Sequence, residues 1–248
     1  MDQDDAAFDN RFDDERFRLI KGNFSDLYRH LRFHGVTVVD GVMADFGVSS
    51  HQFDTGDRGF STRLEGPLDM RMNTGGELDA RQVVNEYSLA ELRTVFNQYG
   101  ELRNAHRIAS EIIEKRAEAP ITSTQALVAI ITPILPKHLF NKIIARVFQA
   151  IRIEVNNELE VIKSFLTQTV DLISRGGRLV CISYHSLEDR LVKHFIREGK
   201  FEGVAESDLY GNKHIPFKKV GGLITPSDEE IRLNSRSRSG KLRIAVRL

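Results

Sequence analysis

The chain has 248 residues, of which 41% are hydrophobic and 28% are charged, enough for one sizeable core or for a core domain with an insertion. Lysines plus arginines equal aspartates plus glutamates at 35 each, which argues against a nonspecific nucleic-acid coat protein and confines any nucleic-acid contacts to local basic patches. The acidic N-terminus excludes a signal peptide, no apolar window is long enough to cross a membrane, and no metal cluster is predicted.

The N-terminal segment is interpreted as the end of one strand and the whole of another. Residues 1–5 would end a strand, with Asp2 where nucleotide-binding folds place an acid on ribose hydroxyls; a frayed acidic terminus is the alternative. Residues 6–12 would form a short helix and residues 17–20 a strand. Phe24 follows, either as a core aromatic or beside a ligand.

The most informative stretch runs from Asp40 to Asn73 and reads DGVMADFGVSSHQFDTGDRGFSTRLEGPLDMRMN. The apolar run at residues 42–44 predicts a buried parallel strand that ends at Asp45 in a ligand-facing turn. Ligands of open α/β sheets bind at this edge, so the carboxylate of Asp45 and the amide of Gln52 are expected to converge there. An ordinary polar turn is the alternative.

The next hundred residues follow a helical spacing. We predict helices over residues 78–96, with Ser88 as an N-cap before LAEL, over residues 103–117, and from Ser123 or Thr124 to Pro133. This block is interpreted as a helical insertion. Residues 139–174 predict an almost unbroken helix that bridges two domains. Within it, four polar residues either point at the site or face water, and solvent is favoured for each: Arg152, Asn156, Asn157 and Glu158.

A second strand with a functional end follows. Residues 178–184, RLVCISY, predict a buried strand that leads into a loop, HSLEDR. Cys181, the one cysteine, would be a buried structural thiol and suits a reducing cytoplasm. His185 would either orient a substrate or accept a proton from it, or else hold two loops together through hydrogen bonds. Residues 200–230 are interpreted as a mobile excursion before a last strand at 242–248.

Several long motifs together resemble one known family. DFGVSSHQFD, RGFS, GPLDMRMN, YGE, RVFQAIRIEVNNEL, GGRLVCISYHSLEDRLVKHF and SRSRSGKLRIA are similar, in this order, to those of the bacterial 16S ribosomal RNA cytosine-N4-methyltransferase family (RsmH, formerly MraW). The resemblance covers nearly the whole chain. It implies S-adenosylmethionine as methyl donor and 16S rRNA in the small ribosomal subunit as partner.

The resemblance also implies the fold class: α/β, a class I SAM-dependent methyltransferase (Rossmann-like) sheet with an inserted all-α domain. Residues 1–60 and 152–248 would form the methyltransferase domain, and residues 61–151 the inserted helical substrate-recognition domain. The first strand and the Gly-rich loop, where the family carries Gly-Gly-His, are absent from this chain. The function is therefore assigned to the family, and this exact chain is expected to be N-terminally incomplete and to risk inactivity.

The resemblance and the local pattern supply the site residues. Positions that match cofactor contacts of the family are Asp2, Phe24, Asp45 and Gln52. The acceptor of the amine proton stays open among Asp45, Ser49, Ser50 and His185. Substrate contacts are predicted for Arg63, Arg71, Arg236 and Arg238, with the arginines of the tail as phosphate donors or simply as a solvated face.

Two further aromatic residues of the stretch from Asp40 to Asn73 are interpreted separately. Phe53 would either receive the splayed base or pack, and packing is favoured for Phe60.

Two rival functions follow from the same residues. A noncatalytic RNA-binding or ribosome-assembly remnant would bind no cofactor, and a DNA cytosine methyltransferase would prefer naked DNA to ribosomal subunits. The predicted location is the cytoplasm. The oligomeric state, including a homodimer, is left open.

Overall fold

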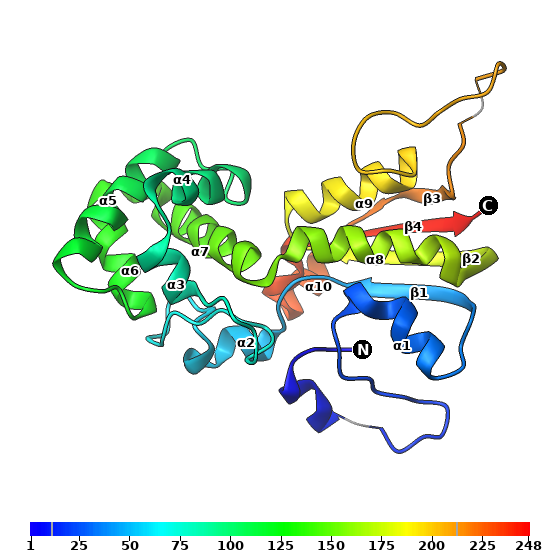
Figure 1. Cartoon of the computed structure of the whole chain (residues 1–248), viewed down its shortest axis with the longest axis horizontal. Helices are drawn as coiled ribbons and strands as arrows, with labels where there is room; N and C mark the ends of the chain where they lie inside the picture. Colours follow the sequence, from blue (N-terminus) through cyan, green and yellow to red (C-terminus); the bar gives the residue numbers. More distant parts are fainter. Residues whose placement is uncertain (11, 212) are drawn as a thin grey trace. The chain divides into compact units, whose positions relative to one another are not determined.

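The computed structural model describes residues 1–10, 12–211 and 213–248, and the chain forms two compact units (Figure 1). Unit 1 comprises Met1–Gly47 and Leu159–Leu248, and unit 2 comprises Val48–Glu158. Each unit has its own hydrophobic core. The domain limits expected at residues 60/61 and 151/152 fall inside unit 2, and they stay a prediction.

Unit 1 is built on a four-stranded sheet in the order β1-β2-β4-β3. The strands are β1 (Val39–Asp45), β2 (Ile173–Ser183), β3 (Phe217–Ile224) and β4 (Lys241–Arg247). β1 pairs with β2 in parallel, whereas β4 pairs antiparallel with both β2 and β3. A mixed sheet with helices fits the α/β class of a SAM-dependent methyltransferase.

Unit 1 also contains helices. They are α1 (Leu27–Phe33), α8 (Glu158–Leu172, whose first residue belongs to unit 2), α9 (Ser186–Glu198) and α10 (Asp228–Leu233), with 3-10 turns η1 (Asp5–Asn10), η2 (Phe24–Asp26) and η6 (Ser235–Ser239). Phe165 of α8 and Val192 of α9 pack in one cluster with Leu179 and Cys181 of β2. Cys181 is fully buried, as predicted, and burial raises the pKa of its thiol to about 12.

The expectation that β1 is a buried strand is wrong. β1 lies at the edge of the described sheet and pairs only with β2 among the described strands. Val42 and Ala44 point to the core cluster. Met43, which lies between them, is 68% exposed. The reason is the period of two in a strand, which places neighbouring side chains on opposite faces.

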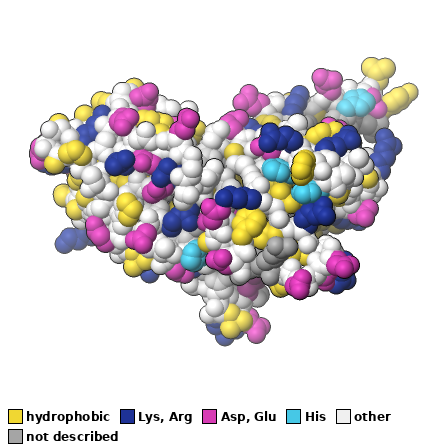
Figure 2. Space-filling model, turned by 60° about the horizontal axis from the view of Figure 1, so that its bottom comes forward, with side chains coloured by type: hydrophobic (Ala, Val, Ile, Leu, Met, Phe, Trp, Pro, Cys, Tyr) yellow, Lys and Arg dark blue, Asp and Glu magenta, His cyan; other side chains and the backbone are white. Residues whose placement is uncertain are grey.

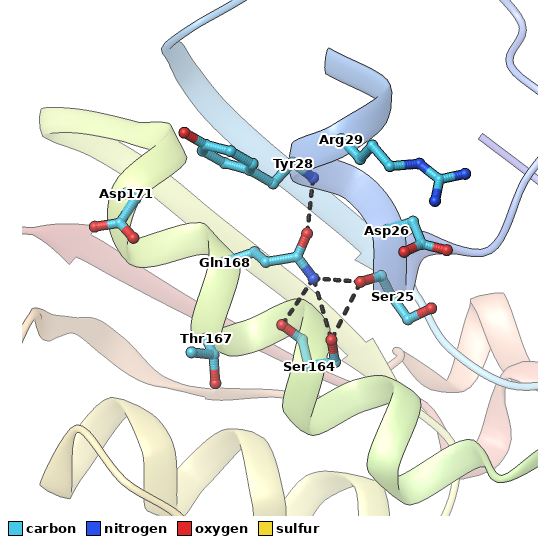
Figure 3. Close-up of a pocket in the computed structure, with 8 residues that line it drawn as sticks. All are labelled: Ser25, Asp26, Tyr28, Arg29, Ser164, Thr167, Gln168 and Asp171. Atoms are coloured by element: carbon cyan, nitrogen blue, oxygen red, sulfur yellow. Dashed lines mark hydrogen bonds between the residues drawn. The ribbon is translucent and has the colours of Figure 1, made fainter. Parts of the chain in front are cut away.

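A glutamine fixes α1 to α8 (Figure 3). The Gln168 side-chain oxygen accepts a hydrogen bond from the Tyr28 backbone N–H at 2.7 Å, and its amide nitrogen donates to the backbone oxygens of Ser25 and Ser164. The first turn of α1 therefore receives a side-chain acceptor from the neighbouring helix.

The strands predicted at residues 1–5 and 17–20 are also wrong. Only an isolated parallel bridge joins Asp2 to Lys21. The Asp2 carboxylate accepts a hydrogen bond from the Asp4 backbone N–H at 2.8 Å, and this side-chain contact turns the chain into η1. The helix predicted at residues 6–12 is thus the 3-10 turn Asp5–Asn10.

Unit 2 is helical in its described residues, with one isolated bridge, Pro67 to Ser123. Its helices are α2 (Ser50–Asp54), α3 (Ala80–Glu86), α4 (Leu89–Gln98), α5 (Ala105–Glu118), α6 (Thr124–Ile131) and α7 (Phe140–Asn156), with 3-10 turns η3 (Gly56–Arg58), η4 (Thr132–Ile134) and η5 (Lys137–Leu139). The predicted cap Ser88 accepts the expected backbone hydrogen bond, and of the two candidate caps Ser123 and Thr124 it is Ser123 that does so.

Two long helices of the sequence-based interpretation are each divided. The expected helix over residues 78–96 is α3 and α4, because Tyr87 is extended and Ser88 starts a new capping box. The expected helix over residues 139–174 ends at Asn157, which has a φ of 49°, the left-handed conformation that terminates a helix. A new helix, α8, begins at the next residue.

Three of the residues assigned to solvent are partly buried and bonded. Arg152 forms a bidentate ion pair with Glu158 at 2.7 and 2.9 Å, and Asn156 bonds the backbone of Met70 and Met72. The solvent assignment is wrong for them because the chain folds the loop before α3 over this end of α7.

Two loop assignments are wrong as well. The HSLEDR segment begins α9 directly after β2, and the excursion at residues 200–230 contains β3 and the start of α10. Within the described part of the chain, no helix combines the length and the apolar character needed to cross a membrane.

Candidate active site

The parallel pairing of β1 and β2 brings Asp45 and Tyr184 to the same edge of the sheet. Asp45 lies opposite Ile182 in the register, and the Phe46 N–H donates to the Ile182 carbonyl at 3.0 Å. Tyr184 comes two residues after Ile182, so its side chain stands on the same face as that of Asp45. The Tyr184 hydroxyl lies close enough to the Asp45 carboxylate to act on its pKa as a hydrogen-bond donor.

The surroundings of this pair shift both groups toward their neutral forms. Burial of the carboxyl raises the pKa of Asp45, the hydrogen bond from Tyr184 opposes this, and the charge of Glu188 adds to the rise. Burial and the nearby carboxylates of Asp45 and Glu188 raise the pKa of Tyr184 to about 12. Tyr184 is therefore a donor at neutral pH, and Asp45 is a stronger base than an ordinary aspartate.

Glu188 shapes the turn that carries Tyr184. Its side chain is fully buried, and Oε2 accepts hydrogen bonds from the backbone N–H groups of Tyr184 at 2.8 Å and of His185 at 3.2 Å. This turn is also packed against β1, because a Cβ added to Gly47 would lie 3.7 Å from Glu188 Oε1 and 3.9 Å from Tyr184 Cδ2.

His185 closes the same turn from the other side. Its Nδ1 accepts from the Glu188 N–H at 3.4 Å, which makes His185 the N-cap of α9, and its Nε2 lies 3.1 Å from Glu188 Oε1. Both contacts tie the His185 ring to Glu188. They favour a histidine that holds the turn over one that accepts a substrate proton.

Sequence reasoning missed Tyr184 and Glu188 as site residues. The H-x-x-E spacing at a strand end is a capping-box pattern and could have indicated Glu188. Tyr184 carries no local signal beyond its place at the end of an apolar run, because its partner lies on a strand 139 residues earlier in the chain.

Phe24 belongs to an aromatic cluster that includes Phe46, the residue that follows Asp45. Its ring centroid lies 5.9 Å from that of Phe46 and 5.4 Å from that of Phe165. Phe46 is buried, whereas Phe24 is only half-buried. Phe24 is thus a core aromatic that also keeps part of its ring accessible to a flat ligand.

Asp2 is held near the segment that leads into Phe24. Its backbone accepts a hydrogen bond from the Gly22 N–H and donates to the Ile20 carbonyl, at 2.9 and 3.1 Å. One carboxylate oxygen is used by the Asp4 N–H. The side chain is exposed, so it is accessible to a hydroxyl-bearing ligand.

Ser49, Ser50 and Gln52 lie in unit 2 and build α2. Ser49 Oγ accepts from the Gln52 N–H at 3.2 Å, and the Gln52 side-chain oxygen accepts from the Ser49 N–H at 3.0 Å. Ser49 therefore acts as a helix cap. Ser50 is the first, exposed residue of the helix.

The predicted substrate arginines differ in how firmly they are held. Arg71 forms a bidentate ion pair with Asp69, at 2.9 and 2.7 Å, and donates to the Gly76 carbonyl. Burial raises the pKa of Asp69, but the hydrogen bonds and charge of Arg71 outweigh it and hold that pKa below its usual range. By contrast, Arg63 is exposed in the same loop, and Arg236 and Arg238 are exposed on η6.

Among the described residues, the face shown in Figure 2 carries no single basic field. Figure 2 shows Lys and Arg side chains interspersed with Asp and Glu over the face that it presents. A hollow of about 460 Å³ lies between η2, α1 and α8, but the hydrogen bonds of Gln168 cross it and no strand end reaches it (Figure 3). The edge with Asp45 and Tyr184 is therefore the better candidate.

Comparisons with known proteins show the family of the chain. The profile of the MraW methylase family matches residues 1–248. Proteins named ribosomal RNA small subunit methyltransferase H are 54% identical in Flavobacterium johnsoniae and 54% identical in Christiangramia forsetii, each over 100% of this chain and 82% of the relative. The protein of that name in Cytophaga hutchinsonii is 48% identical over 100% of this chain and 84% of its own length. The chain belongs to the MraW methylase family.

Proposed function

We propose that this chain transfers a methyl group from S-adenosylmethionine to the exocyclic N4 amine of a cytidine in 16S rRNA of the small ribosomal subunit. The chain is a small-subunit ribosomal RNA methyltransferase by its family and its relatives. The observation that carries the residue-level proposal is the Asp45 carboxylate at the carboxyl end of β1, oriented by Tyr184.

The residues of unit 1 suit the donor. S-adenosylmethionine supplies, when bound, an electrophilic methyl group on a sulfonium. The accessible part of the Phe24 ring can stack on an adenine, and the exposed carboxylate of Asp2 can accept hydrogen bonds from ribose hydroxyls. The buried rings of Phe46 and Phe165 give this side of the site an apolar wall. The assignment of Gln52 to the donor stays a prediction from the family resemblance.

Asp45 is the residue that we assign as acceptor of the amine proton. The lone pair of a cytosine amine is delocalised into the ring, so the nitrogen attacks well only when its protons are drawn away. The nitrogen gains the methyl group and loses one proton, and a carboxylate with a raised pKa is suited to receive that proton. Tyr184 fixes the carboxylate, which serves the alignment that this displacement requires.

Ser49 and His185 are less suited to this task. Their side-chain acceptors already cap α2 and α9, respectively. Ser50, the exposed first residue of α2, stays a predicted candidate. We therefore place His185 among the positioning residues of the turn.

The RNA contacts follow from exposure. Arg63 and Arg238 are exposed and can contact phosphates, whereas Arg71 is committed to Asp69 and serves the loop. A phosphate contact of Arg236, which is also exposed, stays a prediction. Recognition of the folded substrate by residues 61–151 stays a prediction. The reaction belongs in the cytoplasm, because the proposed substrate is the small ribosomal subunit.

The test mixes the chain with labelled S-adenosylmethionine and small subunits that lack the modification, followed by mass analysis of digested nucleosides. We expect N4-methylated cytidine with the wild type and none with Asp45→Ala. Naked DNA in a parallel reaction should stay unlabelled. Binding of the donor without any transfer to subunits or DNA would contradict the proposed reaction and support an RNA-binding role.

A further inference from the structure

A small hollow adjoins the Asp45 edge within unit 1. It lies at the carboxyl end of β2 and has a volume of about 150 Å³. Its walls come from β2, from the segment after β3, from α10, from η6 and from β4. Lining residues that matter for its chemistry are Ile182, Tyr184, Ile224, Glu230, Ser237 and Leu242.

The lining combines an apolar interior with a polar rim. Ile182 and Leu242 are paired neighbours in the sheet and present aliphatic side chains, and the Tyr184 ring adds an aromatic one. The Glu230 carboxylate can accept hydrogen bonds, whereas the Ser237 hydroxyl donates its hydrogen bond to the Asn234 carbonyl at 2.7 Å. An unpaired nucleobase has matching properties, since its faces are apolar and its edge carries N–H donors.

Gly240 keeps the hollow open. A Cβ added there would lie 2.9 Å from the Ser237 carbonyl oxygen and 3.8 Å from Tyr184 Cε1. The opposite edge of the same ring faces Gly47, whose added Cβ would lie 3.9 Å from Tyr184 Cδ2. Tyr184 therefore stands between the hollow and the chain beside Asp45, so the hollow suits a base next to the target rather than the target itself.

Positive charge flanks the hollow where an RNA backbone would pass. Arg236 and Arg238 are exposed on either side of Ser237, and Lys241 lies in the lining. Lys241 also forms an ion pair with Asp189, at 3.5 Å. Arginines beside an aromatic pocket match the phosphates on the two sides of a bound base.

We propose that this hollow binds an unpaired nucleobase that flanks the target cytidine of the RNA substrate. The proposal rests on the proposed function, because it assumes that RNA reaches the Asp45 edge. It adds a subsite that contributes to substrate affinity and leaves the donor site unchanged.

The test fills the hollow from its rim. Thr225 is exposed and lines the hollow, so Thr225→Trp should occupy it without disturbing the core. Leu223→Trp is the matched control, since Leu223 is exposed two residues earlier and is not part of the lining. We expect Thr225→Trp to raise the KM for unmodified small subunits about 10-fold, with unchanged equilibrium binding of labelled S-adenosylmethionine, and Leu223→Trp to change neither.

A second measurement does not depend on methyl transfer. Single-stranded RNA that carries 4-thiouridine is irradiated with the wild type, and the crosslinked peptides are mapped by mass. Crosslinks to Tyr184 or to residues 224–226, lost in Thr225→Trp and kept in Leu223→Trp, support the subsite even if the chain transfers no methyl group. An unchanged KM in Thr225→Trp, or crosslinks that map only outside the hollow, would overturn it whether or not the chain methylates RNA.

Discussion

The carboxyl edge of β1 in unit 1 and the loop before α3 in unit 2 carry similar charged residues and use them in opposite ways. In the loop, the Arg71 guanidinium donates its hydrogen bonds to Asp69 and to the Gly76 carbonyl. At the edge, the Asp45 carboxylate receives one hydrogen bond from a neutral tyrosine and stays accessible. A charge that is paired with another fixed charge stabilises the fold, whereas a charge held by a neutral donor remains able to react.

The same contrast holds for the surrounding backbone. Arg58 donates to the carbonyls of Arg71 and Met72, and Asn156 bonds Met70 and Met72, so the loop is tied to α7. At the edge, the comparable side-chain acceptor is Glu188, which binds the backbone of the turn and leaves the Tyr184 hydroxyl for Asp45. A polar residue whose hydrogen-bonding groups are all paired within the protein is structural, and one that keeps such groups accessible is a candidate for reaction. This distinction is sharper than the one given by residue type.

The largest effect is expected at Asp45. Asp45→Asn keeps the shape but removes the base, so methyl transfer should fall by about 100-fold or more. Because the pKa of Asp45 is raised in the folded protein, the stability that it contributes is present below its unfolded pKa and is lost as pH rises through the folded pKa. The variant should therefore be at least as stable as the wild type at neutral pH.

Asp40→Asn is the control for that substitution, since Asp40 is exposed on the same strand. The test measures the rate of labelled methyl transfer and the melting temperature of the wild type, Asp45→Asn and Asp40→Asn. An active Asp45→Asn enzyme would remove Asp45 from the mechanism.

The next effect concerns Arg71 and is a loss of stability. Arg71→Ala breaks a half-buried, charge-assisted pair and should cost about 1.5–3 kcal/mol of the free energy of unfolding. Arg63→Ala, at an exposed position of the same loop, should change stability by no more than about 0.5 kcal/mol. Chemical denaturation measures both.

RNA binding should show the reverse order. Arg63→Ala should reduce the slope of log K against log salt concentration by about 0.7–0.9, the contribution of one phosphate contact, and Arg71→Ala should leave the slope unchanged. If Arg71→Ala lowers the slope and preserves stability, then its ion pair is not what holds the loop.

A smaller effect, in pH dependence, is expected for Tyr184→Phe. The hydrogen bond from Tyr184 lowers the pKa of Asp45, so its loss should raise that pKa and move the rising limb of the pH–rate profile upward by about one pH unit. The matched control is Tyr87→Phe, which removes the hydrogen bond from Tyr87 to Glu154 at 2.7 Å in unit 2. Its pH profile should coincide with that of the wild type, and a shift in both variants would show a global effect.

The smallest effect is expected at a helix cap. Ser88→Ala removes the capping box of α4 and should cost about 1 kcal/mol of stability. Asn97→Ala, exposed in the same helix, should change stability by less than about 0.5 kcal/mol. Methyl transfer at a temperature where both variants are folded should match the wild type, and a loss of rate in Ser88→Ala alone would tie α4 to the chemistry.

Some features of this protein are determined by local sequence. The caps Ser88 and Ser123 and the strand that ends at Asp45 follow from residue type and spacing, because each depends on neighbours within a few positions. The apolar run around Cys181 likewise predicts a buried thiol. The long motifs likewise identify the family, and the profile match over residues 1–248 confirms it.

Tertiary structure decided the rest. Whether β1 is buried depends on how many strands flank it, and whether Arg71 or Arg152 meets solvent depends on carboxylates that folding brings to them. The pairing of Tyr184 with Asp45 needs the register between β1 and β2, which joins residues far apart in the chain. Hydrogen bonds and burial between distant segments have no local pattern, so the reactive edge could be located from the sequence but its partners could not be named.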